Sequence, residues 1–229
     1  MNNQIKEQVN KTIRNNRMQE YSLLSQDEID KLRRDEFVEM IRLVYDASKD
    51  IDWNAYNYNS MIEYNNLGLQ KIPLQFNYYK VKAPKKVSKC LKNEAYYSSI
   101  FEAYLFEVGA FINIDYNKKA LMKYMSTTMS KERNYIPDAV IDGVFIECKG
   151  VMGSCDDYGQ KYVDIKNQGG KVLIVLQHRD IIIPNPLTAL NNPVTQEEYL
   201  IKHEIPFVYA DDLCVINTLS DLTSFSRSF

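Results

Sequence analysis

The sequence predicts an α/β fold in which a mixed central sheet is flanked by helices. Two apolar runs on either side of Asp142-Gly143 predict a β-hairpin, because this dipeptide favours the positive φ angles of a two-residue turn. A continuous apolar run at 171–177 follows Gly169-Gly170 and predicts a buried strand. Before the hairpin, apolar residues at helical spacing from Ile100 to Phe111 predict a helix. A hairpin followed by a helix and a strand predicts a mixed sheet.

The N-terminal third is expected to be mostly helical and to lie outside this core. Ser25 and Glu28 form a capping-box pattern, and apolar residues follow at roughly helical spacing to about Ala47. We place the domain boundary after a lysine-rich tract, so that residues 1–95 form an accessory region and residues 96–229 form the core.

The core elements follow in order. Ser99 and Glu102 match a capping box at the start of the first core helix, and the polar stretch 112–134 is interpreted as a helix and a loop. After the hairpin, residues 158–168 predict a helix that ends at two glycines. Thr195 begins a later helix through another capping box.

The end of the chain predicts one more strand and one more helix. The apolar residues 206–209 indicate the strand, and Asp211 or Asp212 is expected to cap the helix that follows.

The hairpin register places two carboxylates opposite each other. With a two-residue turn, Ile141 pairs with Val144, and Asp138 pairs with Glu147. Opposed side chains have Cβ atoms roughly 4.5–5.5 Å apart, so like charges there are destabilising. Lys149 lies on the same face as Glu147 because strand side chains alternate. The sequence therefore predicts a compact cluster of two acids and one amine.

Such a cluster suits phosphate chemistry with a divalent cation. Mg²⁺ usually takes one or two carboxylates and completes its shell with water and phosphate oxygens. The Lys149 ammonium can orient the attacking water or stabilise the negative charge that develops at phosphorus. Taken separately, Glu147 to Lys149 would be read as a solvated strand face and Pro137-Asp138 as a turn. Their register across one hairpin favours a site.

These residues also resemble a known motif. Pro137-Asp138 followed by Glu147-Cys148-Lys149 resembles the PD-(D/E)xK signature of the restriction-endonuclease-like nucleases. The order of the elements is similar to that of the phage endonuclease I family of Holliday-junction resolvases, over about residues 96–212. The passages that carry this likeness are Ser98 to Glu102, Tyr135 to Gly150 and Val194 to Phe207. The N-terminal residues have no counterpart in a minimal resolvase.

The resemblance implies a restriction-endonuclease-like core that hydrolyses DNA phosphodiester bonds with Mg²⁺, for which Mn²⁺ substitutes. The implied catalytic residues are Glu102, Asp138, Glu147 and Lys149. The implied metal ligands are Asp138, Glu147 and the main-chain carbonyl of Cys148. For Glu102 the capping role remains an open alternative.

The expected macromolecular partner is DNA, with branched DNA as the favoured substrate. Six lysines fall between residues 80 and 92 with no acid among them, a run that is either a solvated linker or a track for a phosphate backbone. The candidate DNA contacts in this tract are Lys82, Lys85, Lys86 and Lys89. A homodimer would present two sites to two strands by two-fold symmetry.

Composition adds few constraints. Hydrophobic residues make up 45% and charged residues 25% of the 229, and the net charge is −2, so no global basic field argues for nucleic acid. The four cysteines show no disulfide or zinc spacing, and no apolar run reaches the roughly 18 residues that cross a bilayer. We expect a cytoplasmic protein with no membrane partner; the resemblance implies a phage protein that acts in the host cell.

Two other functional readings stay open at this point. Within the enzymes, a sequence-specific restriction, homing or transposase-type endonuclease would use the same cluster. Outside them, a non-catalytic DNA-binding or assembly protein could keep the fold without turnover, because a fold does not determine a function.

Overall fold

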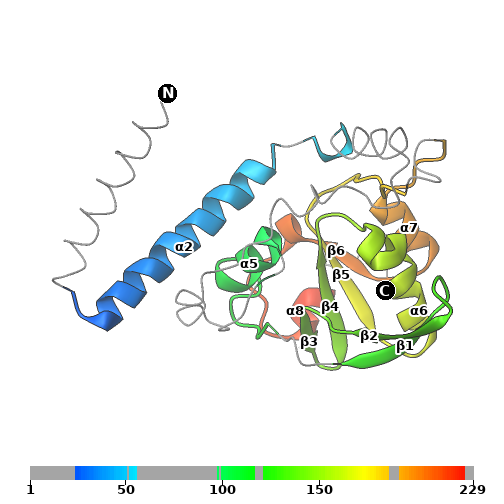
Figure 1. Cartoon of the computed structure of the whole chain (residues 1–229), viewed down its shortest axis with the longest axis horizontal. Coiled ribbons are helices and arrows are strands. Elements are labelled where there is room, and N and C mark those ends of the chain that lie inside the picture. Colours follow the sequence, from blue (N-terminus) through cyan, green and yellow to red (C-terminus); the bar gives the residue numbers. More distant parts are fainter. Residues whose placement is uncertain are drawn as a thin grey trace.

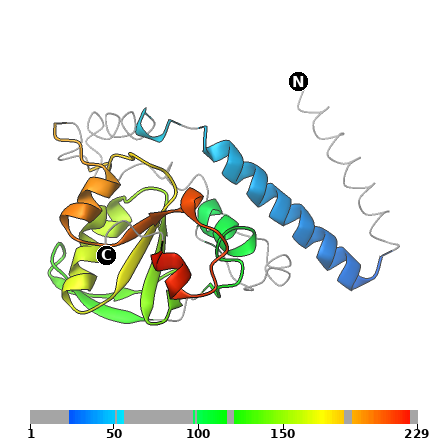
Figure 2. The ribbon, with the colours of Figure 1, turned by 180° about the vertical axis from the view of Figure 1, so that it is seen from behind.

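The chain forms a β-sheet that lies between two layers of helices (Figures 1 and 2). The computed structural model describes residues 24–50, 52–55, 97, 99–116, 121–185 and 191–224. The sheet has the strand order β3-β4-β5-β6, with bounds β3 (Ala139–Ile141), β4 (Val144–Lys149), β5 (Val172–Leu176) and β6 (Phe207–Tyr209). The helices are α2 (Gln26–Ser48), α5 (Ile100–Glu107), α6 (Gln160–Asn167), α7 (Gln196–Lys202) and α8 (Leu219–Thr223). The predicted mixed α/β architecture is confirmed.

The β3–β4 hairpin forms in the expected register. Ala139 pairs with Ile146, and Ile141 pairs with Val144 in an antiparallel ladder. Asp142 and Gly143 both have positive φ, 49° and 79°, as a two-residue hairpin turn requires.

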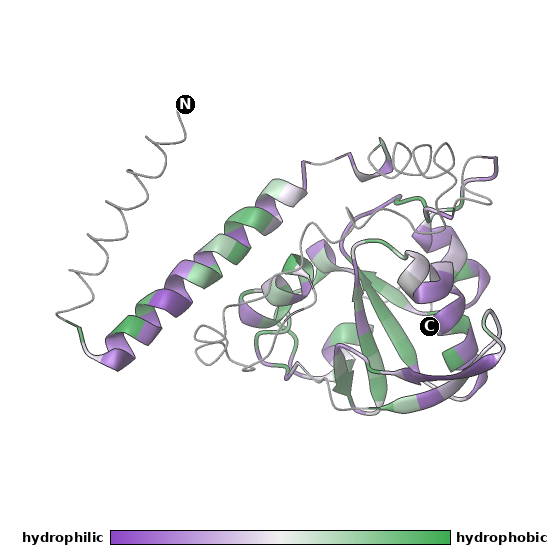
Figure 3. Ribbon diagram, in the orientation of Figure 1, coloured by the Kyte–Doolittle hydropathy of each residue, from purple (hydrophilic) through white to green (hydrophobic). Residues whose placement is uncertain are grey.

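Strands β4, β5 and β6 run parallel, so the sheet is mixed. The sequence of β5, Val-Leu-Ile-Val-Leu, is buried along its whole length because helices cover both faces of the sheet. Figure 3 shows this as apolar colouring that continues across the central strands. Helix α6 makes the crossover between the parallel strands β4 and β5.

Two hydrophobic clusters lie on opposite faces of the sheet. Ile146 and Val175 pack with α5 and α2 in the first cluster, whereas Phe145 and Ile174 pack with α6 and α7 in the second. Alternation along β4 therefore sends Glu147 and Lys149 toward the α6 side.

Helix α2 is part of the first cluster although it belongs to the predicted accessory region. The capping box at Ser25 and Glu28 is present. Ile41 and Tyr45 are buried in the core, and the Tyr45 ring stacks on Tyr104 of α5 at a centroid distance of 3.7 Å. None of the helices in the described part of the chain is both long enough and apolar enough to span a membrane.

The interpretation of 112–134 as a helix and a loop is wrong. From residue 122 on, this stretch forms an antiparallel hairpin of β1 (Met122–Ser126) and β2 (Lys131–Tyr135). Its polar composition is misleading because one face is exposed, while Tyr124 and Tyr135 turn into the second cluster. Buried Asp164 of α6 holds the hairpin through the Thr127 N–H and hydroxyl, each at 2.8 Å.

Two predicted helix ends also differ from the structure. A 3₁₀ segment, η2 (Ser154–Gly159), precedes α6, which begins only at Gln160 because Asp157, Tyr158 and Gly159 have φ of 49°, 53° and 96°. Thr218, and not Asp211 or Asp212, caps the last helix; both aspartates lie in η3 (Ala210–Asp212).

The loop before α6 gives a prediction about stability. Gly159 has positive φ, and a Cβ atom there would lie 2.6 Å from the Tyr199 ring. We expect Gly159→Ala to lower the free energy of unfolding in urea by about 2–4 kcal/mol, from backbone strain and overpacking. Gly153→Ala is the matched control, because Gly153 has φ −105° and nothing within 4 Å of the added Cβ. Equal effects of the two substitutions would contradict this account.

Candidate functional site

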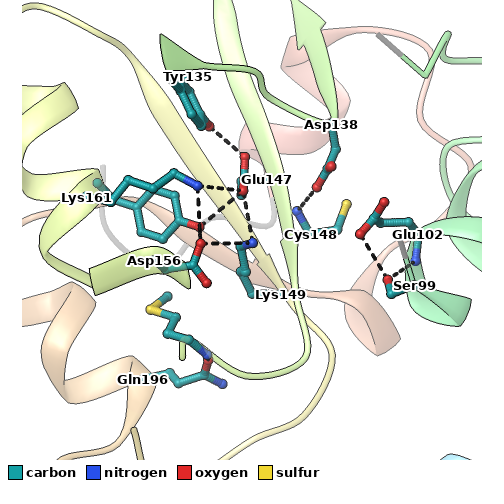
Figure 4. Close-up of polar contacts among 12 residues, drawn as sticks. Ser99, Glu102, Tyr135, Asp138, Glu147, Cys148, Lys149, Asp156, Lys161 and Gln196 are labelled. Atoms are coloured by element: carbon teal, nitrogen blue, oxygen red, sulfur yellow. Dashed lines mark hydrogen bonds and ion pairs between the residues drawn. The ribbon is translucent and has the colours of Figure 1, made fainter. Parts of the chain in front are cut away.

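Four charged side chains beside the end of β4 form a closed ring of ion pairs (Figure 4). Lys149 Nζ lies 3.0 Å from Glu147 Oε1 and 3.2 Å from Asp156 Oδ1. Lys161 Nζ lies 3.4 Å and 3.2 Å from the same two oxygens. We call Glu147, Lys149, Asp156 and Lys161 the ion-pair tetrad. The predicted pairing of Glu147 with Lys149 is present.

The two acids of the tetrad are buried, its two lysines are half-buried, and two tyrosine hydroxyls donate to the acids. Tyr135 donates to Glu147 Oε2 at 2.8 Å, and Tyr162 donates to Glu147 Oε1 at 3.2 Å and to Asp156 Oδ1 at 2.7 Å. Glu147 thus accepts from two ammonium groups and two hydroxyls. Three of these donors, Lys149, Lys161 and Tyr162, are on Oε1, and Tyr135 alone is on Oε2.

The two ammonium groups keep the acids of the tetrad ionised. Burial by itself would raise the pKa of Glu147 and of Asp156, but Lys149 and Lys161 outweigh it and lower both values. Burial likewise opposes the charge of Lys161, and Glu147 and Asp156 overcome it, so that the pKa of Lys161 is raised.

Asp138 lies at the edge of β4. Its Oδ2 accepts the Cys148 N–H at 2.8 Å, so the side chain takes the place of a ladder acceptor. The Lys149 carbonyl accepts the Gln177 N–H, next to β5. Because backbone N–H and C=O groups of successive residues point to opposite sides of a strand, those of Cys148 point toward β3. The Asp138 N–H donates to the carbonyl of Ile146 at 3.0 Å, although Ile146 already pairs with Ala139, so the ladder does not continue to the predicted pair of Asp138 with Glu147.

The pKa of Asp138 is raised well above its usual range. Burial is the main cause, and the charges of Glu102 and then Glu147 add to it. Figure 4 shows Asp138 and Cys148 between these two acids, with Glu102 on one side and Glu147, within the tetrad, on the other. Of the predicted cluster of two acids and one amine, the structure shows the ion pair of Glu147 with Lys149, whereas Asp138 contacts the main chain of Cys148.

Glu102 takes part in the capping of α5 that the sequence predicted, and its charge acts on Asp138. Ser99 Oγ accepts the Glu102 N–H at 3.1 Å and so caps α5. The Ser99 hydroxyl also donates to Glu102 Oε1, and the Tyr116 hydroxyl donates to Oε2. The buried carboxylate is thereby held beside Asp138, whose pKa it raises.

The donor set suits a hard cation that needs few side-chain ligands. Among the described residues, no three His, Cys, Asp or Glu side chains form a group that could hold a metal ion. Asp138, Glu147 and the Cys148 carbonyl supply oxygen donors, and Mg²⁺ commonly completes such a set with water. These residues fit the predicted group on the chemistry of their donors.

Sequence reasoning missed Asp156, Lys161, Tyr135 and Tyr162. Asp156 and Lys161 follow Lys149 closely in sequence, but only the turn at η2 brings them into contact with the other members of the tetrad. It also missed Gln196, which is fully buried and joins α7 to the loop after β4: its Oε1 accepts the Met152 N–H at 2.7 Å. Alternation would have found Tyr135, since it faces inward at the end of β2.

The candidate DNA contacts Lys82, Lys85, Lys86 and Lys89 lie outside the described residues, and they stay a prediction. No protein-family model, curated protein or solved structure matches the chain. The function is therefore argued from the geometry of the site.

Asp138 gives a prediction about stability and pH. Because its pKa in the folded protein lies above the ordinary value of about 4, the folded protein loses stability as pH rises above that value. Asp138→Asn does not titrate and can still accept the Cys148 N–H. We expect it to raise Tm at neutral pH in EDTA, by roughly 2–4 °C for each kcal/mol of repulsion removed, with a difference that shrinks toward pH 4.

Asp142→Asn, in the turn of the same hairpin, is the control. Asn tolerates the positive φ there, so we expect little change in Tm. A destabilised Asp138→Asn protein at neutral pH would contradict the elevated pKa.

Proposed function

We propose that the chain is a metal-dependent DNA endonuclease with a restriction-endonuclease-like core of the PD-(D/E)xK kind. The observation that carries this proposal is the charge of the site. Its described side chains comprise four acids and two amines: the buried Glu102, Glu147 and Asp156, the half-buried Asp138, and Lys149 and Lys161. When all six are ionised, the negative charges outnumber the positive charges by two. A divalent cation is the complement that such a site requires.

The ligands proposed for this cation are Asp138, Glu147 and the carbonyl of Cys148. The Cys148 N–H donates to Asp138 Oδ2, and the Cys148 carbonyl is directed to the same side of β4, which supports the choice of this carbonyl.

Each side chain has a task in phosphodiester hydrolysis. A bound Mg²⁺ or Mn²⁺ supplies a more acidic water and neutralises charge on the phosphoryl group. Lys149 orients the attacking water or stabilises the transition state, and Glu102 is the further acid of the proposed catalytic set. Hydrolysis proceeds by in-line attack without a covalent enzyme intermediate.

Branched DNA is the proposed substrate, following the likeness to the phage resolvases, and a homodimer would cut both strands. The lysine tract at 80–92 would add contacts to the phosphate backbone. A sequence-specific restriction, homing or transposase-type endonuclease remains the competing enzyme.

One observation favours a second function. Glu147 accepts from two ammonium groups and two hydroxyls, as it would in a purely structural network. A non-catalytic DNA-binding or assembly protein would have such a network.

The test of the nuclease uses three substrates. Purified protein with Mg²⁺ is incubated with supercoiled plasmid, linear duplex and a four-way junction, and we expect cleavage of the junction first. Asp138→Asn and Lys149→Met should lower the cleavage rate by about 100-fold or more, because transition-state stabilisation is lost. Asp142→Asn and Lys123→Met, a change to an exposed lysine of β1, should cleave like the wild type.

The outcomes separate the candidates. Fixed cut positions on the linear duplex would replace the resolvase with a sequence-specific enzyme. Binding of DNA without nicking under Mg²⁺ or Mn²⁺ would favour the non-catalytic protein. Cleavage that persists unchanged in Asp138→Asn and Lys149→Met would remove this site from the reaction.

A further inference from the structure

Both amines of the tetrad are shared between the same two oxygen atoms. The distances from Lys149 Nζ to Glu147 Oε1 and Asp156 Oδ1 differ by 0.2 Å, and so do those from Lys161 Nζ. Tyr162 is also shared, and its hydroxyl lies closer to Asp156, at 2.7 Å, than to Glu147, at 3.2 Å. Every donor on Glu147 Oε1 is therefore already in contact with Asp156.

This sharing bears on how Glu147 can reach a cation. Three donors, Lys149, Lys161 and Tyr162, contact Oε1, whereas Oε2 accepts from Tyr135 alone, so a cation can bind Glu147 through Oε1 only if donors leave that oxygen. An ammonium group that left without another anion would be a buried unpaired charge, which is strongly destabilising.

We infer that Asp156 is a positioning residue that takes over both ammonium groups from Glu147 when a divalent cation binds. This inference rests on the proposed function. Both Nζ atoms already lie 3.2 Å from Asp156 Oδ1, so the exchange needs small side-chain rotations and no movement of the backbone.

The exchange explains why the tetrad has four members. Asp156 keeps Lys149 beside the reacting phosphate after Glu147 has turned to the cation. Lys161 neutralises Asp156, so that this second acid does not compete for the cation. The main chain fixes Asp156 in η2, where its N–H donates to the Gly153 carbonyl at 3.0 Å.

The experiment titrates the full-length chain with Mn²⁺ alone, without DNA, by isothermal calorimetry. We expect Asp156→Asn to weaken Mn²⁺ binding by about tenfold or more, a change of roughly 1.4 kcal/mol, because Lys149 and Lys161 stay on Glu147. Asp157→Asn is the matched control: Asp157 is the next residue, its side chain is also buried, and it pairs with Arg133 at 2.9 Å outside the tetrad. Its substitution should leave the affinity unchanged.

A double variant distinguishes the exchange of the ammonium groups from an effect of net charge on Mn²⁺ affinity. Asp156→Asn with Lys161→Met removes one charge of each sign, so an effect of net charge alone would restore the wild-type affinity. Under the exchange, the double variant still lacks the carboxylate that Lys149 shares, and it binds Mn²⁺ more weakly than the wild type. This variant also carries the test if Asp156→Asn alone does not fold.

The results distinguish this inference from the proposed function. A wild type that binds Mn²⁺ while the double variant binds it equally well would overturn the exchange and leave the nuclease standing. A wild type that binds no Mn²⁺ would overturn both.

Discussion

The two-residue turn at Asp142 and Gly143 is the constraint on which the site depends. Because side chains alternate with a period of two, a shift of one residue in the β3–β4 register would move Glu147 and Lys149 to the opposite face. The positive φ angles at the turn exclude that shift by fixing which residues pair. Everything else in the site is arranged around a strand whose polar face is thereby determined.

Burial makes the arrangement of charges decisive. An ion pair of lysine and glutamate on an exposed strand would contribute little to the stability of the fold. In a buried site each charge needs a partner of the opposite sign. Helix α6 supplies Lys161 and η2 supplies Asp156, and together they compensate the charges that the β4 motif brings inside. The elevated pKa of Asp138 shows where this compensation is incomplete.

Short-range sequence patterns predicted the turns and helix starts that neighbouring residues determine. The hairpin followed from Asp142-Gly143, and α7 followed from its capping box at Thr195. The β1–β2 hairpin escaped prediction because its stability comes from contacts with α6, among them Thr127 with Asp164, and such contacts leave no mark in the short-range pattern.

The same limit applies to the site. Glu147 and Lys149 were predictable because two residues on one strand face are neighbours by geometry. The position of Asp156 and Lys161 depends on three consecutive residues of positive φ, two of which are not glycine. Such a turn is set by its surroundings, so composition does not reveal it.

The stacking of Tyr45 on Tyr104 links helix α2 to the helix that carries Glu102. Helix α5 carries Glu102 on its first turn, and α2 lies along α5 with Tyr45 buried between them. Ser48, at the end of α2, also accepts from Gln177 just after β5. Helix α2 therefore supports α5, which carries Glu102. A chain shortened to residues 96–229 would lose this support.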